Sequence, residues 1–386
     1  MKKLLAIIMT AMMLLTCVSM FSFGAAAATN VVYVKDGGTG DGTSADKATA
    51  DLANAYSTLA TSGGTIVICG TYDLAKAPGN TGNYFVEPDH TGAITVTQVY
   101  GGTDYRTDGG AVTVTADTRW ALNGPTTFEN VTFKKTAGNC VLFVAQYNKL
   151  VMGEGVVCDG FTFGALGSST TILGGFQKGF DKANETELKL DLDSDITVKS
   201  GKFMIIGNSR QFSGTTFTGK SNITIDGGEV TKLWAGTVNG GKTSGDCTVT
   251  INGGNFLSVM EATNYGAAAG NVTFNINGGT FADGAKITVS ETDETGKTVV
   301  NIVKTLSNAE AIKAAITGGG TVNMVEPAAD TTNTTTSTDS TTNAPTTSKP
   351  TDNPSTGDMT FVVAIVAALS VAACASVVIA KKVKEN

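Results

Sequence analysis

The sequence predicts an all-β fold, a parallel β-helix (solenoid) built from stacked rungs, and three observations support this. The chain of 386 residues contains 47 glycines, and only 16% of its residues are charged. Strong helix formers gather in two segments, whereas threonine, asparagine and glycine dominate elsewhere. A strand–turn–strand phrase, TINGGNF at 250–256, recurs as TIDGGEV (224–230), NINGGTF (275–281) and, more loosely, TVKSGKF (197–203).

The spacing of this phrase favours a solenoid over a sandwich. Its second glycine falls at Gly201, Gly228, Gly254 and Gly279, so the steps are 27, 26 and 25 residues. One such unit cannot bury its own apolar face, but stacked units can. Residues 29–305, at about 26 residues per turn, would give about ten rungs and a rod about 50 Å long, because neighbouring strands lie about 4.8 Å apart.

Each repeat has the same predicted parts. An alternating strand such as Ile223-Thr-Ile225 points its apolar residues to one face. An Asx-Gly-Gly turn follows, because these residues tolerate positive φ. The second strand comes next, as in EVTKLW (229–234). Trp234 and Met260 each lie six positions after their glycine, so we expect them to be neighbours on adjacent rungs.

Two helical segments are predicted to cap the rod, whose exposed sheet edges would otherwise invite aggregation. In the first, Leu52, Ala55, Tyr56 and Leu59 recur at helical spacing before Gly63-Gly64. The second is a helix–strand cap at residues 306–327. There Ser307 and Glu310 form a predicted capping box, and Ala309, Ile312 and Ile316 share a face.

The segment YVKDGGTGDGTSADKATADLANAY…GGTIVICGTYDL (33–74) resembles the opening of pectin-lyase-like proteins, and the pattern extends over 31–305. The resemblance implies a right-handed β-helix whose first rung is covered by an amphipathic helix. Its motifs are structural and specify little about activity, but that superfamily includes polysaccharide lyases and polygalacturonases, so an enzyme is considered. The NTD, GHG and RIK motifs of polygalacturonases are absent from the sequence, and no arginine has a lyase-like setting.

Both ends of the chain contain predicted targeting segments. Residues 1–28 have two lysines, an apolar run and a small-residue end, which is typical of a signal peptide. Residues 328–352 are a Thr/Ser-rich stretch without apolar periodicity, predicted to be a disordered stalk. Residues 359–380 are apolar and uncharged, long enough for one transmembrane helix, and lysines follow them.

The order of motif, apolar span and basic tail in 353–386 resembles the cell-wall sorting signal of Gram-positive surface proteins. The motif is NPSTG, with Asn353, Pro354, Thr356 and Gly357, and Asn353 stands where the family usually has leucine. The resemblance implies cleavage between Thr356 and Gly357 by a sortase and attachment to peptidoglycan. The alternative is an ordinary membrane anchor. In either case the body is expected at the cell surface, held by the membrane helix before any sorting.

Acidic residues suggest one metal site, and the overall charge excludes one class of partner. A net charge of −7 and a pI near 4.9 disfavour nucleic acid. Asp191, Asp193 and Asp195 would share one face of a strand and could hold Ca²⁺, the one cofactor considered. The alternative is a solvated face, with Leu190 and Leu192 inward. The single histidine, His90, is expected in a polar loop without a catalytic role.

Two groups of residues are candidates for a weak ligand-binding face, because sugars stack on aromatic rings. The first comprises Trp234, Arg210, Glu261 and Tyr265, with Asn264 beside them. The second comprises Tyr105, Arg106 and Trp120, with Arg119 beside them. The alternative is that Trp120 and Trp234 fill the core between rungs.

Four cysteines outside the terminal segments lie in apolar runs without metal-ligand spacing: Cys69, Cys140, Cys158 and Cys247. Buried small hydrophobic residues are expected, with a Cys140–Cys158 disulfide as an alternative.

Three functions are compatible with this sequence. The first is a surface-anchored β-helix of a Gram-positive bacterium for adhesion or glycan binding, with a host or microbial polysaccharide as partner. The second is a polysaccharide lyase or glycoside hydrolase on the same scaffold, with catalytic residues that the sequence does not identify. The third is a structural spacer.

Overall fold

The computed structural model describes residues 30–78, 84–138, 140–162, 169–176, 190–210, 214–238, 240–261, 267–268, 270–288, 298–317 and 320–327. The predicted signal peptide, stalk, sorting signal and transmembrane helix lie outside these residues. Within them, no helix has the length and apolar character needed to cross a bilayer.

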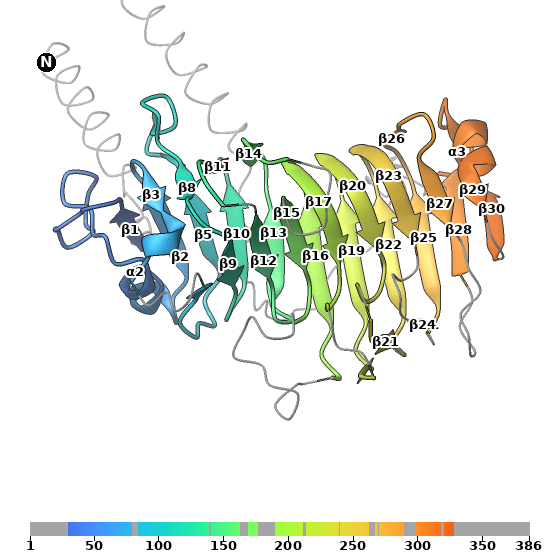
Figure 1. Ribbon diagram of the computed structural model, residues 1–386, viewed down its shortest axis with the longest axis horizontal. Helices are drawn as coiled ribbons and strands as arrows, with labels where there is room; N and C mark the ends of the chain where they lie inside the picture. Colours follow the sequence, from blue (N-terminus) through green and yellow to red (C-terminus); the bar gives the residue numbers. More distant parts are fainter. Residues whose placement is uncertain are drawn as a thin grey trace, which may run out of the picture. The chain divides into compact units, whose positions relative to one another are not determined.

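The described chain is a parallel β-helix (Figure 1), as the sequence predicts. Strands visit successive faces and return one rung further on, so each face is a stack of parallel strands. Eleven strands form the longest face, sheet A. They are β1 (Val31–Val34), β2 (Gly64–Ile68), β5 (Ile94–Thr97), β10 (Thr126–Glu129), β13 (Lys149–Met152), β16 (Ser194–Val198), β19 (Ser221–Ile225), β22 (Cys247–Ile251), β25 (Val272–Ile276), β28 (Thr298–Val303) and β30 (Thr321–Val325).

Two further faces complete the rungs. Sheet C has ten strands: β4 (Tyr84–Val86), β9 (Thr118–Ala121), β12 (Val141–Val144), β15 (Thr170–Leu173), β17 (Lys202–Gly207), β20 (Glu229–Trp234), β23 (Asn255–Glu261), β26 (Thr280–Phe281), β27 (Lys286–Thr288) and β29 (Ile316–Thr317). Sheet B has four: β3 (Tyr72–Asp73), β8 (Val112–Val114), β11 (Thr132–Lys135) and β14 (Val157–Asp159). In later rungs a separate three-stranded parallel sheet is formed by short strands: β18 (Thr216–Phe217), β21 (Lys242–Thr243) and β24 (Ala267–Ala268).

The core is a set of in-register rows running along the solenoid. On sheet A, Ile223 pairs with Val249, and Val249 with Phe274, and all are at most 1% exposed. The intervening positions face outward, as Thr224 and Thr250 do. This alternation is what the sequence pattern predicts, because side chains of a strand point to opposite faces in turn.

The glycine pairs form the tight turns between faces. Gly228, Gly254 and Gly279 have φ of +82°, +92° and +91°, a region that residues with a Cβ atom rarely adopt. Side chains of the Asx residues beside these glycines form a chain of hydrogen bonds from rung to rung. Asn252 Nδ2 donates to Asp226 Oδ1 at 2.8 Å, and Asn277 Nδ2 donates to Asn252 Oδ1 at 2.9 Å. The repeated Asx-Gly-Gly phrase therefore encodes one turn per rung.

Helices lie near the two ends of the solenoid (Figure 1). The N-cap of α2 (Leu52–Leu59) is Asp51, whose side chain accepts the backbone N–H of Asn54 at 2.9 Å. Its four predicted core residues are fully buried. α3 (Ala309–Ala315) leads directly into β29, and Ala309 and Ile312 are buried. The predicted capping box is wrong, because the N-cap of α3 is Asn308 and makes no side-chain capping bond.

Two other expectations are corrected by the structure. Trp234 pairs with Glu261 rather than with Met260, because the register shifts between Val230 and Lys232. The alternative of a disulfide is wrong, because Cys140 and Cys158 are both free thiols. Burial raises the pKa of each to about 11.

Candidate functional site

The two tryptophans lie inside the protein, in agreement with the alternative considered for them. Trp120 is fully buried, and its ring packs edge-on against Phe128 with centroids 4.8 Å apart. Its indole Nε1 donates to Glu87 Oε1 at 2.8 Å. Trp234 is 2% exposed, and its Nε1 donates to Glu261 Oε2 at 2.8 Å. Neither indole presents a stacking face to solvent.

The first predicted group is gathered on one side, but around apolar side chains. Trp234 belongs to a second apolar cluster, separate from the main core. The backbone of Arg210 forms an isolated parallel β-bridge with Val238, a member of that cluster. Burial lowers the pKa of the Arg210 guanidinium. Trp234 and Glu261 are neighbours on β20 and β23. Tyr265 and Asn264 lie outside the described residues.

The three aspartates do not form the predicted strand face. Strand β16 begins at Ser194, so Asp191 and Asp193 precede it and only Asp195 lies within it. Leu192, expected inward, is 39% exposed. Asp193 Oδ1 accepts the backbone N–H of Lys220 at 2.8 Å. Among the described residues, no three acidic, histidine or cysteine side chains are arranged to hold a metal ion.

His90 is buried and paired rather than exposed in a polar loop. Its Nε2 lies 3.0 Å from Glu87 Oε2, and both side chains are fully buried. Its Nδ1 lies 2.9 Å from the carbonyl oxygen of Gly92. Burial alone would lower the pKa of His90, but the hydrogen bonds to Glu87 and Gly92 and the nearby negative charges outweigh it and raise this pKa. Because both side chains are buried and paired with each other, we assign the pair a structural role.

A tyrosine-bearing hairpin projects after β5. Strands β6 (Val99–Tyr100) and β7 (Thr103–Asp104) pair antiparallel across Gly101 and Gly102, whose φ values are +60° and +84°. Two consecutive glycines in this region suit the two-residue hairpin turn that matches strand twist. The sequence VYGGTDY therefore folds locally into a hairpin flanked by tyrosines.

The hairpin is fastened to the solenoid at its base. The guanidinium of Arg106 forms a bidentate ion pair with Asp104: Nε donates to Oδ1 at 2.9 Å and Nη2 donates to Oδ2 at 2.7 Å. Its Nη1 reaches the carbonyl of Gly155 at 3.2 Å, 49 residues further along the chain. The backbone N–H of Tyr105 donates to the carbonyl of Gln98 at 2.9 Å. Arg106, a candidate ligand contact, thus acts as a clamp that holds the hairpin in one position.

This hairpin and the first rung carry three partly exposed tyrosines, which we name the tyrosine surface: Tyr33, Tyr100 and Tyr105. The rings of Tyr33 and Tyr100 meet edge to face, with centroids 6.2 Å apart. Tyr105 follows β7 on the same hairpin, and burial, with a smaller contribution from Tyr33 and Cys69, raises the pKa of its phenol. Rigid aromatic rings with polar tips suit a binding face, because little entropy is lost when they are covered.

Only one of the three tyrosines of this surface, Tyr105, is among the residues predicted from the sequence. Tyr105 and Arg106 were expected to act with Arg119 and Trp120, which instead lie on β9 of sheet C. Arg119 stacks there over the ring of Tyr84, at 4.9 Å from its centroid. Tyr33 and Tyr100 were missed, because 66 residues separate them in the chain. The glycine pair between Tyr100 and Tyr105 was the local signal that could have found the hairpin.

No protein-family model, curated protein or solved structure gives a significant match to this chain. The fold therefore defines its class, a parallel β-solenoid.

Proposed function

We propose that this protein is a surface-anchored β-solenoid that binds carbohydrate through the tyrosine surface and does not cleave it. The observation that carries the proposal is the ring contact between Tyr33 on β1 and Tyr100 on the hairpin, with Tyr105 on the same hairpin and all three side chains partly exposed. Sugar rings offer apolar C–H faces to aromatic rings and hydroxyls to phenols. None of the three tyrosines belongs to the main hydrophobic core of the described residues.

The position of the tyrosine surface supports a role in adhesion. Tyr33 lies on β1, the first strand of sheet A, whereas the described chain ends just after β30, the last strand of that sheet. The predicted stalk and sorting signal follow β30, so a wall attachment would hold the solenoid by its C-terminal end. The tyrosine surface would then be at the far end of the rod, where a partner is met first.

Anchoring is a separate part of the proposal with its own test. The full chain would be expressed in a Gram-positive host, and its release by a muramidase would be measured. We expect Thr356→Ala to shift the protein from the wall fraction to the membrane fraction, because the scissile threonine is lost. Equal release of both forms would contradict sorting at NPSTG and favour an ordinary membrane anchor.

Binding would be tested with a panel of plant, mucin and microbial polysaccharides. The full-length chain, purified in a sugar-free detergent, would be assayed for retention on each polymer. We expect Tyr100→Ala with Tyr105→Ala to reduce retention at least about tenfold, since stacking contacts contribute about 1 kcal/mol or more each. The matched control is Tyr84→Ala, a partly exposed tyrosine on sheet C. Unchanged retention in the double variant, with its far-ultraviolet spectrum intact, would refute the proposal.

One observation favours the spacer as a second candidate. The outer face of sheet A has a long row of polar side chains, in which Thr197, Thr224, Thr250, Asn275 and Asn301 are consecutive partners. Asn301 Nδ2 donates to Asn275 Oδ1 at 2.9 Å, so part of this row is satisfied within the protein. A rod with no specific ligand would bind none of the polymers in the panel.

A further inference from the structure

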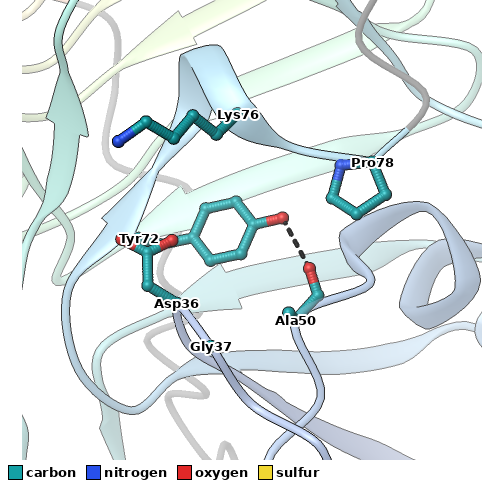
Figure 2. A pocket seen from close by; sticks show the side chains of 6 residues that line it. All are labelled: Asp36, Gly37, Ala50, Tyr72, Lys76 and Pro78. Carbon is teal, nitrogen blue, oxygen red and sulfur yellow. Dashed lines mark hydrogen bonds between the residues drawn. The ribbon is translucent and has the colours of Figure 1, made fainter.

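A cavity lies in the N-terminal rungs, and it is distinct from the tyrosine surface. Its volume is about 320 Å³, and Asp36, Gly37, Ala50, Tyr72, Lys76 and Pro78 line it. Figure 2 shows the Tyr72 ring between the Asp36–Gly37 segment and the segment that carries Lys76 and Pro78. The volume is at the low end of small-molecule sites, which span about 300–1,000 Å³.

The floor of this cavity is fixed by packing. Tyr72 is 2% exposed and belongs to the main core. Its hydroxyl donates to the carbonyl oxygen of Ala50 at 3.0 Å. The rim consists of Asp36, Lys76 and Pro78, which are all exposed. A ligand would therefore enter past charged groups and a proline ring and rest on a rigid base.

Buried Asp73 holds both rim charges in position. Its backbone N–H donates to both carboxylate oxygens of Asp36 at 3.0 Å. Its own carboxylate is 3% exposed and lies 2.9 Å from Lys76 Nζ. Thr115 Oγ1 donates to the same carboxylate at 2.8 Å, and the N–H of Ala75 does so at 3.1 Å. One shared N–H uses only part of the acceptor capacity of the Asp36 carboxylate, so lone pairs remain that can accept from a ligand in the cavity.

The charge balance of this site excludes one kind of ligand. Asp36 and Asp73 contribute two negative charges and Lys76 one positive charge, so the site is net negative. An anion such as a uronate, sialate or phosphate would be repelled, because like charges at short range disfavour binding. A neutral polyol fits better, since its hydroxyls can donate to Asp36 and accept from Lys76. The Pro78 ring offers an apolar contact for C–H groups.

We propose that this cavity binds one neutral sugar residue. It is a second site, which the sequence does not indicate. Two segments bring its residues together. Asp36 lies in the turn that follows β1, and Asp73 is the N-cap of η1 (Leu74–Lys76), a short 3₁₀ helix that follows β3. The cavity recognises a single ring by hydrogen bonds, whereas the tyrosine surface would contact a longer chain by stacking.

The probes for the test are methyl glycosides of glucose, galactose, mannose and N-acetylglucosamine, with glucuronic acid and N-acetylneuraminic acid as anionic counterparts. Binding to the full-length chain would be measured by calorimetry and saturation-transfer NMR in a sugar-free detergent. We expect at least one neutral glycoside to bind with a Kd near the millimolar range. We expect the anionic sugars to bind at least about tenfold more weakly, because the site is net negative.

Three variants test whether any binding occurs in the cavity. Asp36→Asn keeps an oxygen acceptor for the Asp73 N–H but loses the charge, and we expect at least about a tenfold loss of affinity. Asp283→Asn is the control, an exposed aspartate in a late rung. The Tyr100→Ala, Tyr105→Ala variant should retain monosaccharide binding, which separates this site from the tyrosine surface. No neutral binding, equal affinity in Asp36→Asn, or tighter binding of the anionic sugars would overturn the proposal.

Discussion

The buried pair of Glu87 and His90 should make the stability of the N-terminal rungs depend on pH. Both ring nitrogens of His90 face acceptors, Glu87 Oε2 at 3.0 Å and the Gly92 carbonyl at 2.9 Å. An imidazole can donate from both nitrogens only when it is protonated. The folded state therefore favours the charged ring, in agreement with the raised pKa of His90.

The sign of the pH dependence follows from this raised pKa. The unfolded chain binds the proton with a pKa near 6.5. Below that pH both states are protonated, so the stabilisation from the pair is fully present. As the pH rises through the higher pKa of the folded state, the proton leaves and the stabilisation is lost. We expect the wild-type protein to be more stable at pH 6 than at pH 8.5 by a margin that His90→Gln lacks.

Glu87→Gln tests the size of the interaction. The carboxylate also accepts Trp120 Nε1 at 2.8 Å, Thr126 Oγ1 at 3.0 Å and the backbone N–H of Asn123 at 3.3 Å, so with His90 its replacement disturbs four donors. Removing one partner of a buried ion pair costs about 3–5 kcal/mol. We expect about 3 kcal/mol at pH 6, because the glutamine oxygen still accepts one of these bonds.

Tryptophan fluorescence can measure this region directly. Trp120 contacts Glu87, and in a Trp234→Phe background it is the sole tryptophan of the chain. Urea unfolding would be followed at pH 6 and pH 8.5 for this background, Glu87→Gln and His90→Gln. A local probe is preferable because rungs of a solenoid can unfold in separate steps. If all three proteins show the same pH dependence, the charged pair does not exist as described.

Further predictions concern the turn, the tryptophan and the thiols. Gly254→Ala should cost about 1–3 kcal/mol in urea unfolding, because φ is +92° there, whereas Gly101→Ala on the open hairpin should cost less. Trp234→Phe should lose about 1 kcal/mol of stability with its hydrogen bond, yet leave polysaccharide retention unchanged; a loss of retention would restore Trp234 as a ligand contact. Cys140 and Cys158, with pKa values of about 11, should resist alkylation at pH 7.5 in the folded protein and react on unfolding, and a mass consistent with a disulfide would contradict the structure.

The rungs could be predicted from sequence because each depends on local pattern. Alternation set the inward face at Ile223 and Ile225, and the glycine pair set the turn at Gly228. Helical periodicity identified the buried face of α2 without any knowledge of its partners. These features repeat at every rung, so one misjudged position changes little.

The candidate site could not be predicted in the same way, because it depends on register and on contacts between distant residues. One bulge after Val230 moved Trp234 opposite Glu261. Asp191 and Asp193 alternate with leucines as a strand would, but β16 begins only at Ser194. The tyrosine surface depends on a contact between Tyr33 on β1 and Tyr100 on a hairpin that follows β5, two rungs later. No local sequence pattern encodes a contact between residues so far apart in the chain.

We propose that the solenoid binds a carbohydrate chain and leaves it intact. The most direct test incubates the full-length protein with the polysaccharide panel, with and without Ca²⁺, and reads retention together with new reducing or unsaturated ends. We predict retention of at least one polymer, insensitive to Ca²⁺ and without new ends. The appearance of new ends would contradict this account and identify the protein as a carbohydrate-active enzyme.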